Sequence, residues 1–526
     1  MHKRLFASLA VLTVALTAML PAATAADAPT TLKLPAVIGP NMVLQRQMPL
    51  PIWGWDKPGG QVTVKFAGQQ KSATAGADGK WAVTLDPVDA SAKPAKMTVA
   101  GSKTITLSNI LVGEVWLCSG QSNMEQGMGA VDDSAKEIAA AKHPNIRLML
   151  VPKRPSLEPL TDVAASWKPC SPQTVKQGGW GGFSGVAYFF GRTLHKELNV
   201  PIGLIESAWG GTRIEPWTPP AGFAAVKRFH DIPGKLQADA KRLEQQKDTL
   251  IPRVEQWIVK AKAARAAGRP FPPIPQIPGR RINHQGPTAL YNGMVHALVP
   301  FALRGAIWYQ GESNNGEGML YFERMQALIA GWRAVWKQPD LAFHFVQLAP
   351  FRYGRSNPEN LAGIWEAQTA ALSIPGTGMA VTTDIGNIGD IHPRNKQDVG
   401  KRLALCALAK DYGRSGLVYS GPLYKSMKID GRKVRIRFDH VGGGLVSRDG
   451  KPLTWFTVAG ADGKFVEAKA EIDGETVVVS CDAVAAPKAV RFGWDQIAEP
   501  NLANKEGLPA SPFRTDRPKG FPGPAD

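Results

Sequence analysis

The chain has 526 residues, which is enough for more than one hydrophobic core and suggests three or four domains. Its formal net charge of +18 would suit a nucleic-acid-binding protein, but the basic residues are scattered and no nucleic-acid-binding motif accompanies them. We therefore expect no nucleic-acid partner. A solvated basic surface accounts for the charge, and attraction to acidic glycans or to a negatively charged cell envelope is the alternative.

The first 25 residues have the pattern of a secretory signal peptide. A basic start at 1–4 is followed by an apolar stretch from 5 to about 20 and by the small-residue cleavage pattern at 23–25. Ala26 is the expected new N-terminus. Because the apolar stretch is too short to cross a membrane and no later stretch replaces it, we predict a periplasmic or extracellular protein without a membrane span.

Four cysteines are spread along the chain, at Cys118, Cys170, Cys406 and Cys481. In an oxidising compartment they allow up to two disulfides. Their spacing is not that of metal ligands. Cys118 and Cys406 lie in apolar runs, which favours burial as small hydrophobic residues.

Residues 26–107 and 416–526 both have the pattern of β domains. In the first, apolar and polar residues alternate at 51–55, 62–66 and 81–85, with Gly-rich turn signals between them. This predicts a small β-sandwich with a structural or sugar-facing accessory role. In the second, strands are expected at 434–438, 455–458, 475–479 and 489–494, which predicts another β-sandwich.

The segment 108–415 between them has the pattern of an α/β domain. Apolar runs of strand length are each followed by a polar block, and helix-type patterns occur at 184–198 and 396–410. This alternation predicts a parallel sheet with right-handed crossovers. Because open α/β folds place their sites at the carboxyl ends of the strands, we expect the four polar blocks to meet at one edge. The blocks are 114–124, 207–212, 308–314 and 390–393.

The order of these blocks resembles the SGNH (GDSL-like) hydrolases, in which a Ser, a Gly, an Asn and an Asp/His block follow one another. The residues within the blocks resemble the sialate O-acetylesterase family of these hydrolases. They are Gly-Gln-Ser-Asn-Met, Trp-Gly-Gly-Thr, Gln-Gly-Glu-Ser-Asn and Asp-Ile-His-Pro. The resemblance covers nearly the whole mature chain. It implies a flavodoxin-like parallel sheet with helices on both faces, flanked by two β-sandwich-like domains.

The resemblance also implies an exported serine esterase that removes O-acetyl groups from sialic acids (9-O-acetyl type) or related glycans through an acetyl-enzyme. Two alternatives stay open. One is an acetylxylan or hemicellulose acetylesterase on the same scaffold, and the other is a non-catalytic carbohydrate-binding protein. The sequence has no metal-binding pattern, phosphate loop or dinucleotide fingerprint, so no cofactor is expected.

Ester hydrolysis needs a nucleophile, a base and a group that orients the base. Ser122 is the predicted nucleophile and His392 the predicted base. The acid is Asp390 by family motif, although it stands two residues before His392, where the wider superfamily has a spacing of three and this chain has Gly389. Asp384 is the alternative, and a backbone carbonyl can also orient the base.

For the oxyanion hole, the resemblance nominates the backbone N–H groups of Ser122 and Gly211 and the side-chain amide of Asn314. Glycine allows a close backbone approach, and an amide is a neutral donor that can be fixed in advance. Polar side chains that could hold these groups in place are Gln121, Gln310 and Glu312.

Substrate recognition is less determined by the sequence. Four aromatic residues stand next to the blocks and could be platforms for sugar rings or core filler: Trp209, Trp217, Trp308 and Tyr309. Arg213 is placed to pair with a sugar carboxylate, or to make a domain contact.

The segment 221–281 interrupts the α/β pattern. Its first part predicts a helix, or two helices broken at Pro252, and its Pro-rich part at 269–279 must be extended. Because the segment lies between the Gly211 and Asn314 blocks, at least one of its ends is expected near the catalytic edge. It forms either a wall or lid of the site or an insertion without influence on it.

Overall fold

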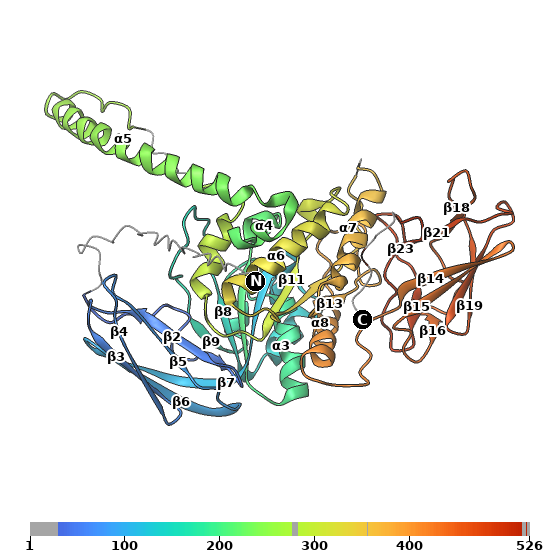
Figure 1. The fold of residues 1–526 in the computed structure, drawn as a ribbon, viewed down its shortest axis with the longest axis horizontal. Coiled ribbons are helices and arrows are strands. Elements are labelled where there is room, and N and C mark those ends of the chain that lie inside the picture. The colour runs from blue at the N-terminus through green and yellow to red at the C-terminus, as the bar shows by residue number, and fades with distance from the viewer. Residues whose placement is uncertain (1–29, 276–281, 355, 518–521, 523–526) are drawn as a thin grey trace, which may run out of the picture.

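The structure is a computed structural model that describes residues 30–275, 282–354, 356–517 and 522. The predicted signal peptide and the last part of the Pro-rich stretch lie outside the described residues. Figure 1 shows an α/β body with one β domain at each end of the molecule and a long helical arm. None of the described helices is long and apolar enough to cross a membrane.

The centre of the molecule is a sheet in the order β13-β12-β11-β7-β10-β8-β9. All neighbours in this order are parallel except the edge pair of β8 and β9. The strands are β7 (Thr104–Gly120), β8 (His143–Leu150), β9 (Trp167–Cys170), β10 (Ile202–Ala208), β11 (Gly305–Tyr309), β12 (Ala342–Val346) and β13 (Thr377–Ala380). The mostly parallel α/β fold predicted from the sequence is confirmed.

Helices cover both faces of this sheet, as two neighbouring residues of β12 show. Phe343 contacts Trp332 of α6 (Leu320–Trp336), whereas His344 binds Asp411 directly after α8 (Lys396–Lys410) at 2.6 Å. Successive side chains of a strand point to opposite faces, so α6 and α8 lie on opposite sides. The remaining helices of the body are α1 (Ser122–Glu125), α2 (Ser134–Ala140), α3 (Gly185–Leu198), α4 (Pro220–Ala225) and α7 (Glu359–Ala370).

The N-terminal β region is continuous with the central sheet through β7. This 17-residue strand pairs with β6 and β1 in its first part and with β10 and β11 in its second. The predicted boundary at 107 therefore falls inside one strand, and the two regions share one hydrophobic core. The other strands are β1 (Val43–Gln45), β2 (Leu50–Trp55), β3 (Gln61–Phe66), β4 (Gln69–Thr74), β5 (Lys80–Leu85) and β6 (Ser91–Ala100).

The C-terminal β domain has a hydrophobic core of its own. Two four-stranded sheets have the orders β14-β15-β20-β19 and β18-β17-β21-β23, and β16 pairs with β22. An ion pair between Arg514 and Glu366 of α7 joins it to the α/β domain. The strands are β14 (Leu423–Asp430), β15 (Lys433–Asp439), β16 (Leu445–Ser447), β17 (Phe456–Ala459), β18 (Val466–Glu467), β19 (Lys469–Asp473), β20 (Thr476–Ser480), β21 (Ala489–Phe492), β22 (Leu502–Asn504) and β23 (Phe513–Arg514).

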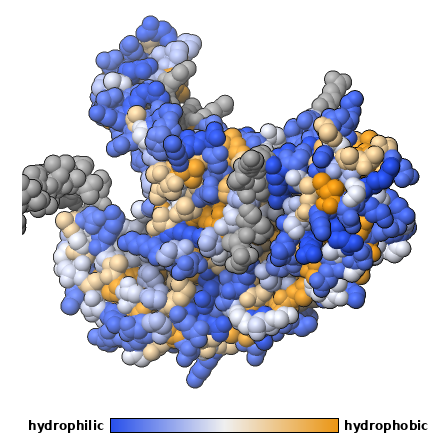
Figure 2. Space-filling view, turned by 45° about the vertical axis from the view of Figure 1, so that its right-hand side comes forward, coloured by the Kyte–Doolittle hydropathy of each residue, from blue (hydrophilic) through white to orange (hydrophobic). Residues whose placement is uncertain are grey.

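The interrupting segment forms one long helix, α5 (Ile232–Ala266), which projects from the body beside α4 (Figure 1). The alternative of two helices broken at Pro252 is wrong. Proline has no N–H for the carbonyl one turn earlier, but this part of the helix is exposed and water can satisfy that carbonyl. Hydrophilic residues cover most of the arm in Figure 2. The return chain lies along the helix, where the Trp257 indole donates to the carbonyl of Pro272 at 2.9 Å.

The four cysteines are all unpaired, and Cys118 and Cys406 are fully buried as the apolar runs predict.

Candidate active site

The central strand β7 delivers Ser122 to the carboxyl edge of the sheet. Gly120 ends the strand at φ +145, and a Cβ there would lie 2.1 Å from the carbonyl oxygen of Tyr309 on β11. Only glycine fits this close approach. The chain then turns, and Ser122 is the first residue of α1.

His392 comes from the loop between β13 and α8 and meets Ser122 directly. Its Nε2 lies 2.9 Å from the Ser122 hydroxyl oxygen. This is the distance that a general base needs to take the proton of a nucleophile. The two residues stand 270 positions apart in the chain, and the topology of the sheet brings them together.

Two buried side chains hold the backbone on both sides of His392. Asn123 donates its side-chain amide to the Ile391 carbonyl at 2.9 Å, and Lys396 donates its ammonium to the Pro393 carbonyl at 2.6 Å. The Lys396 ammonium also donates to Oδ1 of Asn123 at 2.7 Å. The loop that carries the imidazole is thus held by Asn123 and Lys396, which are hydrogen-bonded to each other.

The same network ends on a buried carboxylate. Asn123 donates to Oε1 of Glu312 at 2.6 Å. Burial raises the pKa of Glu312, and burial lowers the pKa of Lys396 to about 7. The sequence predicts Lys396 only as the first residue of a helix, and it predicts no role for the Asn123 side chain. A hydrogen bond from a side chain to a distant backbone carbonyl leaves no pattern in the sequence.

The imidazole of His392 is tuned toward its neutral form. Burial lowers its pKa below the usual 6.5, the positive charge of Lys396 lowers it further, and Asp390 raises it in opposition. A neutral imidazole can accept a proton from Ser122, so the arrangement favours a general base at neutral pH.

Asp390 lies beside His392 without a hydrogen bond to its ring. Its Oδ1 accepts the backbone N–H of His392 at 2.9 Å and lies 3.8 Å from Nδ1, and its side chain is 52% exposed. Asp384 is placed elsewhere, because both of its oxygens bind Arg402, at 2.6 and 2.7 Å. Of the two acids considered from the sequence, only Asp390 is near the base.

The glycine block is packed against the nucleophile. A Cβ on Gly210 would lie 3.2 Å from the Cβ of Ser122, so the Gly210-Gly211 turn lies against Ser122. The N–H of Gly210 donates to the carboxylate of Glu125, which also pairs with Lys153. Gly211, at φ +72, is the next residue and is exposed.

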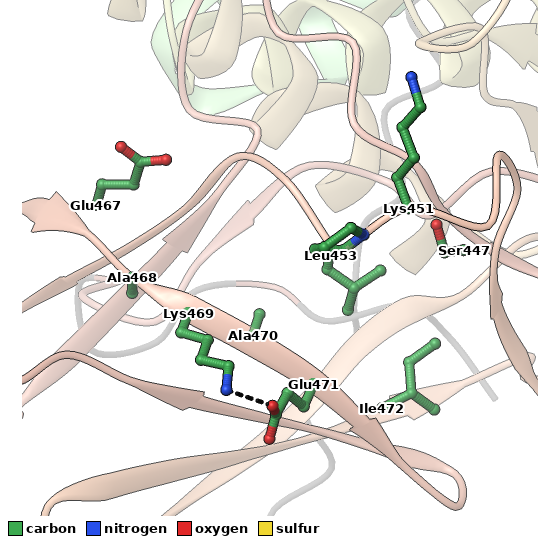
Figure 3. A pocket seen from close by; sticks show the side chains of 10 residues that line it. Ser447, Lys451, Leu453, Glu467, Ala468, Lys469, Ala470, Glu471 and Ile472 are labelled. Atoms are coloured by element: carbon green, nitrogen blue, oxygen red, sulfur yellow. Dashed lines mark ion pairs between the residues drawn. The ribbon is translucent and has the colours of Figure 1, made fainter.

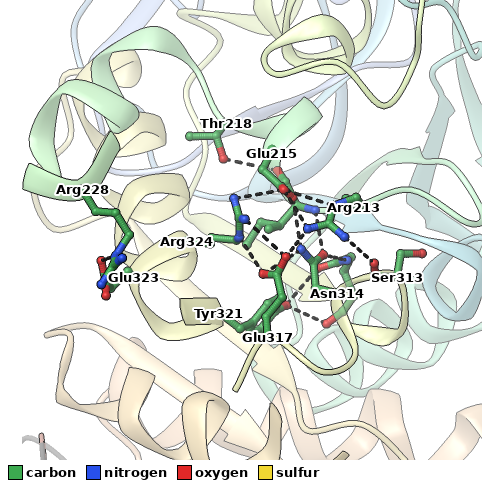
Figure 4. Close-up of polar contacts among 12 residues, drawn as sticks. Arg213, Glu215, Thr218, Arg228, Ser313, Asn314, Glu317, Tyr321, Glu323 and Arg324 are labelled. Carbon is green, nitrogen blue, oxygen red and sulfur yellow. Dashed lines mark hydrogen bonds and ion pairs between the residues drawn. The ribbon is translucent and has the colours of Figure 1, made fainter. Parts of the chain in front are cut away.

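Asn314 is fully buried and has its amide occupied. Its Oδ1 accepts from Gln310 at 2.8 Å, and its Nδ2 donates to Glu215 at 3.1 Å and to Glu317 at 3.2 Å (Figure 4). Both N–H bonds of the amide are therefore engaged by carboxylates. A role of Asn314 as oxyanion donor requires that one of them be released.

Arg213 belongs to a closed ion cluster around Asn314 (Figure 4). Its guanidinium binds Glu215 at 3.1 Å and also Glu317. Arg324 pairs with the same two carboxylates, at 3.0 Å for Glu215 and 2.6 Å for Glu317. Two arginines are thus balanced by two glutamates. The role considered for Arg213 in binding a sugar carboxylate stays a prediction, and it requires that the guanidinium be shared with Glu215 and Glu317.

The predicted polar shell links three of the blocks. Gln310 donates to Oε1 of Gln121 at 3.1 Å and to the Thr212 carbonyl at 3.2 Å, in addition to Asn314. These contacts tie the Ser122 block to the Gly211 and Asn314 blocks. Glu312 takes part through Asn123.

Of the four aromatic residues that stand next to the blocks, three are buried in the core. Trp217, Trp308 and Tyr309 are at most 1% exposed. Trp209 is half-buried and stacks on His284, with ring centroids 4.9 Å apart. The Lys153 ammonium lies 5.7 Å from the Trp209 ring.

Trp180 is an aromatic neighbour of His392 that the sequence analysis missed. Its ring meets the imidazole edge-on at 4.7 Å, and it is 42% exposed. The run of glycines on both sides, at 178–182, was the available signal, because it marks a loop that can approach another backbone closely.

Residues that follow the interrupting segment lie at this edge, and the segment's own end at 276–281 lies outside the described residues. His284 stacks on Trp209, and Gln285 donates to the Gly211 carbonyl at 2.8 Å and accepts from the Arg213 N–H at 3.1 Å. Within the described ranges, no group of three or more His, Cys, Asp or Glu side chains is arranged to hold a metal ion.

Comparisons with known proteins agree on one family. The model of carbohydrate esterases described as sialic acid-specific acetylesterases matches residues 112–242 and 276–409. Sialate O-acetylesterase of Rattus norvegicus is 32% identical over 427 residues, covering 74% of this chain and 75% of the rat protein. The Homo sapiens enzyme is 30% identical over 433 residues, covering 74% of this chain and 73% of the human protein. The crystal structure of a carbohydrate acetylesterase from Xanthomonas citri, 37% identical, has a TM-score of 0.78 and covers 92% of this chain and 100% of that one.

Proposed function

Because the chain belongs to the sialate O-acetylesterase family of carbohydrate esterases, we propose that it is an exported serine esterase that deacetylates sialic acids or related acetylated glycans. Membership makes it a carboxylic ester hydrolase that acts on acetylated carbohydrate. The observation that supports the serine mechanism is the 2.9 Å contact between His392 Nε2 and the Ser122 hydroxyl.

In the first half of the proposed reaction, the Ser122 oxygen attacks the acetyl carbonyl while His392 Nε2 takes its proton. The backbone N–H groups of Ser122 and Gly211 are the donors proposed for the oxyanion, with Asn314 as a third once its amide is released. Loss of one such donor typically costs on the order of 100- to 1,000-fold in turnover. The imidazolium then gives the proton to the leaving sugar oxygen, which leaves Ser122 acetylated.

In the second half, water attacks the acetyl group on Ser122. His392 again takes a proton, now from the water, and returns it to the Ser122 oxygen as acetate leaves. Every step uses groups of this chain and water. Asn123 and Lys396 keep the imidazole in place throughout, because they hold the carbonyls on either side of it.

The nature of the sugar is the finer part of the proposal. A sialic acid carries a carboxylate, and the arginine predicted to bind it, Arg213, is already balanced by Glu215 and Glu317. This contact pattern favours the second candidate, a neutral acetylated polysaccharide such as acetylxylan. Trp180 and Trp209, which flank the catalytic pair, can stack on either kind of sugar ring.

The experiment is to measure acetate released by the purified protein from 9-O-acetylated sialic acid and from acetylated xylan, with Ser122→Ala as the matched control. We expect release from at least one of them in the wild type and none in the variant. The preferred substrate decides between the two candidates. Acetate release that persists in Ser122→Ala, or hydrolysis of p-nitrophenyl acetate without release from either glycan, contradicts the proposal.

The exported location is proposed on the signal-peptide pattern alone. Mass spectrometry of the protein from the periplasmic or extracellular fraction should find an N-terminus at Ala26. An intact N-terminus on protein confined to the cytoplasm would contradict it.

A further inference from the structure

A groove lies between the N-terminal β region and the α/β domain, beside the core that the two share. Its volume is about 980 Å³, which is at the upper end of the range of ligand pockets. One wall consists of β2 and β5 with neighbouring residues, and the other consists of residues 296–302 and 336–338. Domain boundaries of this kind are frequent places for ligand sites.

The groove lies away from the catalytic pair. The residues of its second wall come directly before β11 and β12, at the amino ends of the parallel strands. Ser122 follows the carboxyl end of β7 in the same sheet. A ligand in the groove would therefore occupy a site separate from the esterase site.

Four of the lining residues are tryptophans. Trp53 and Trp55 are alternate residues of β2, so they project from the same face of the strand, and both are half-buried. Two further tryptophans, Trp81 and Trp336, line the groove with most of their rings buried. Two indoles that project from the same face of one strand can stack on the apolar C–H faces of consecutive pyranose rings, and the Lys33 ammonium lies 5.4 Å from the centroid of the Trp55 ring.

The pocket of the C-terminal β domain has a different lining, without tryptophans. Figure 3 shows it, with a volume of about 690 Å³ and no aromatic residue among those that line it. Its charged side chains are partly paired with each other, as Lys469 is with Glu471 at 2.7 Å. Size alone therefore does not distinguish the two pockets, but the chemistry of their walls does.

We propose that the groove between the N-terminal β region and the catalytic domain is a second carbohydrate-binding site. It binds a pyranose oligosaccharide by stacking on Trp53 and Trp55. The site would hold a glycan chain on the enzyme without taking part in ester cleavage. The proposal does not depend on which acetylated sugar is cleaved at Ser122.

The test uses the full mature chain with Ser122→Ala, which prevents turnover, and measures binding of xylohexaose, cellohexaose and sialyllactose by isothermal titration calorimetry. We expect at least one of them to bind, and Trp53→Ala/Trp55→Ala to weaken that binding at least tenfold. Trp455→Ala, which removes an exposed tryptophan of the C-terminal domain, is the matched control and should leave binding unchanged.

A second variant keeps the test valid if the double tryptophan variant fails to fold. Ala82 is exposed, lines the groove and lies directly opposite Trp53 in the pairing of β2 with β5, so Ala82→Arg should block the groove without disturbing the core. With Ser122 intact, this variant should hydrolyse p-nitrophenyl acetate at the wild-type rate. Binding of none of the three oligosaccharides overturns the proposal. Unchanged binding in Ala82→Arg, or loss of binding only on Trp180→Ala or Trp209→Ala, would do the same and place recognition at the esterase site.

Discussion

Substitution of Asp390 by Asn tests how much the acid contributes to this site. In the structure the carboxylate is near the imidazole but not bonded to it, since Oδ1 lies 3.8 Å from Nδ1. Asparagine keeps an oxygen that can accept the His392 backbone N–H, which Asp390 now does at 2.9 Å. Asp390→Asn therefore removes the negative charge and little else.

The magnitude follows from the distance. At 3.8 Å a unit charge pair is worth about 1 kcal/mol in bulk water and about 4 kcal/mol at an effective dielectric constant of about 20. Because the side chain is 52% exposed, solvent screening places the value near the lower limit. We expect kcat/KM to fall about 5- to 30-fold. Neutralising the buried, hydrogen-bonded acid of a serine-protease triad costs about 10⁴-fold.

The assay is the pH profile of kcat/KM for p-nitrophenyl acetate, with His392→Ala and Asp390→Ala measured beside it. His392→Ala should lose more than about 10⁴-fold, because base and nucleophile act as a unit. Asp390→Ala also removes the acceptor of the backbone N–H, so we expect it to lose about fivefold more than Asp390→Asn.

The direction of the pH shift is a separate check. The Asp390 charge raises the pKa of His392, so its removal lowers that pKa and moves the acidic limb of the profile to lower pH. A loss in Asp390→Asn as large as in His392→Ala would refute the reasoning. It would mean that Asp390 moves into hydrogen-bond distance of Nδ1 in the reacting enzyme.

Four further outcomes are expected. Ser122→Ala should abolish turnover and leave the thermal melting curve nearly unchanged, and full activity in this variant would remove the central assignment. The acidic limb of the wild-type profile should lie below pH 6.5, because the pKa of His392 is lowered, and a limb above that value would contradict the electrostatics. Lys396→Met should move this limb to higher pH, since a positive charge that lowers the pKa of His392 is lost; an unmoved limb would show that Lys396 is purely structural. Replacing 232–281 by a Gly-Ser linker should preserve p-nitrophenyl acetate hydrolysis and reduce glycan deacetylation, and equal retention of both would show that the arm does not influence the site.

The elements that carry the site were predictable because each has a local signature. The strands before the Ser122, Gly211 and Asn314 blocks are apolar runs of strand length ended by glycine and polar residues, and the structure places them side by side in one sheet. Helix α8 begins at the predicted residue, with Asn395 as its N-cap. Both signals depend on neighbours in the chain, which a sequence displays directly.

What the sequence did not predict depends on surroundings that neighbouring residues do not reveal, either partners distant in the chain or exposure to solvent. Arg213 stood beside a catalytic block and suggested a sugar carboxylate, but two glutamates occupy it, and one of them, Glu317, is 104 positions away. Pro252 suggested a break, but an exposed helix tolerates the lost hydrogen bond. Trp217 and Trp308 suggested sugar platforms, but they pack against each other in the core. Residue type alone does not determine burial or pairing.

The contacts of His392 explain why a half-exposed acid is compatible with this site. An imidazole can be oriented through its ring nitrogen or through the backbone that carries it. Here the carbonyls before and after His392 are held by Asn123 and Lys396, and its N–H is held by Asp390. Because three hydrogen bonds hold this backbone, the orientation of the imidazole depends less on a hydrogen bond to Nδ1 than it would on a mobile loop. The cost is a buried lysine whose charge opposes protonation of the base. Burial and that same charge together keep the imidazole neutral, as the proposed proton transfer from Ser122 requires.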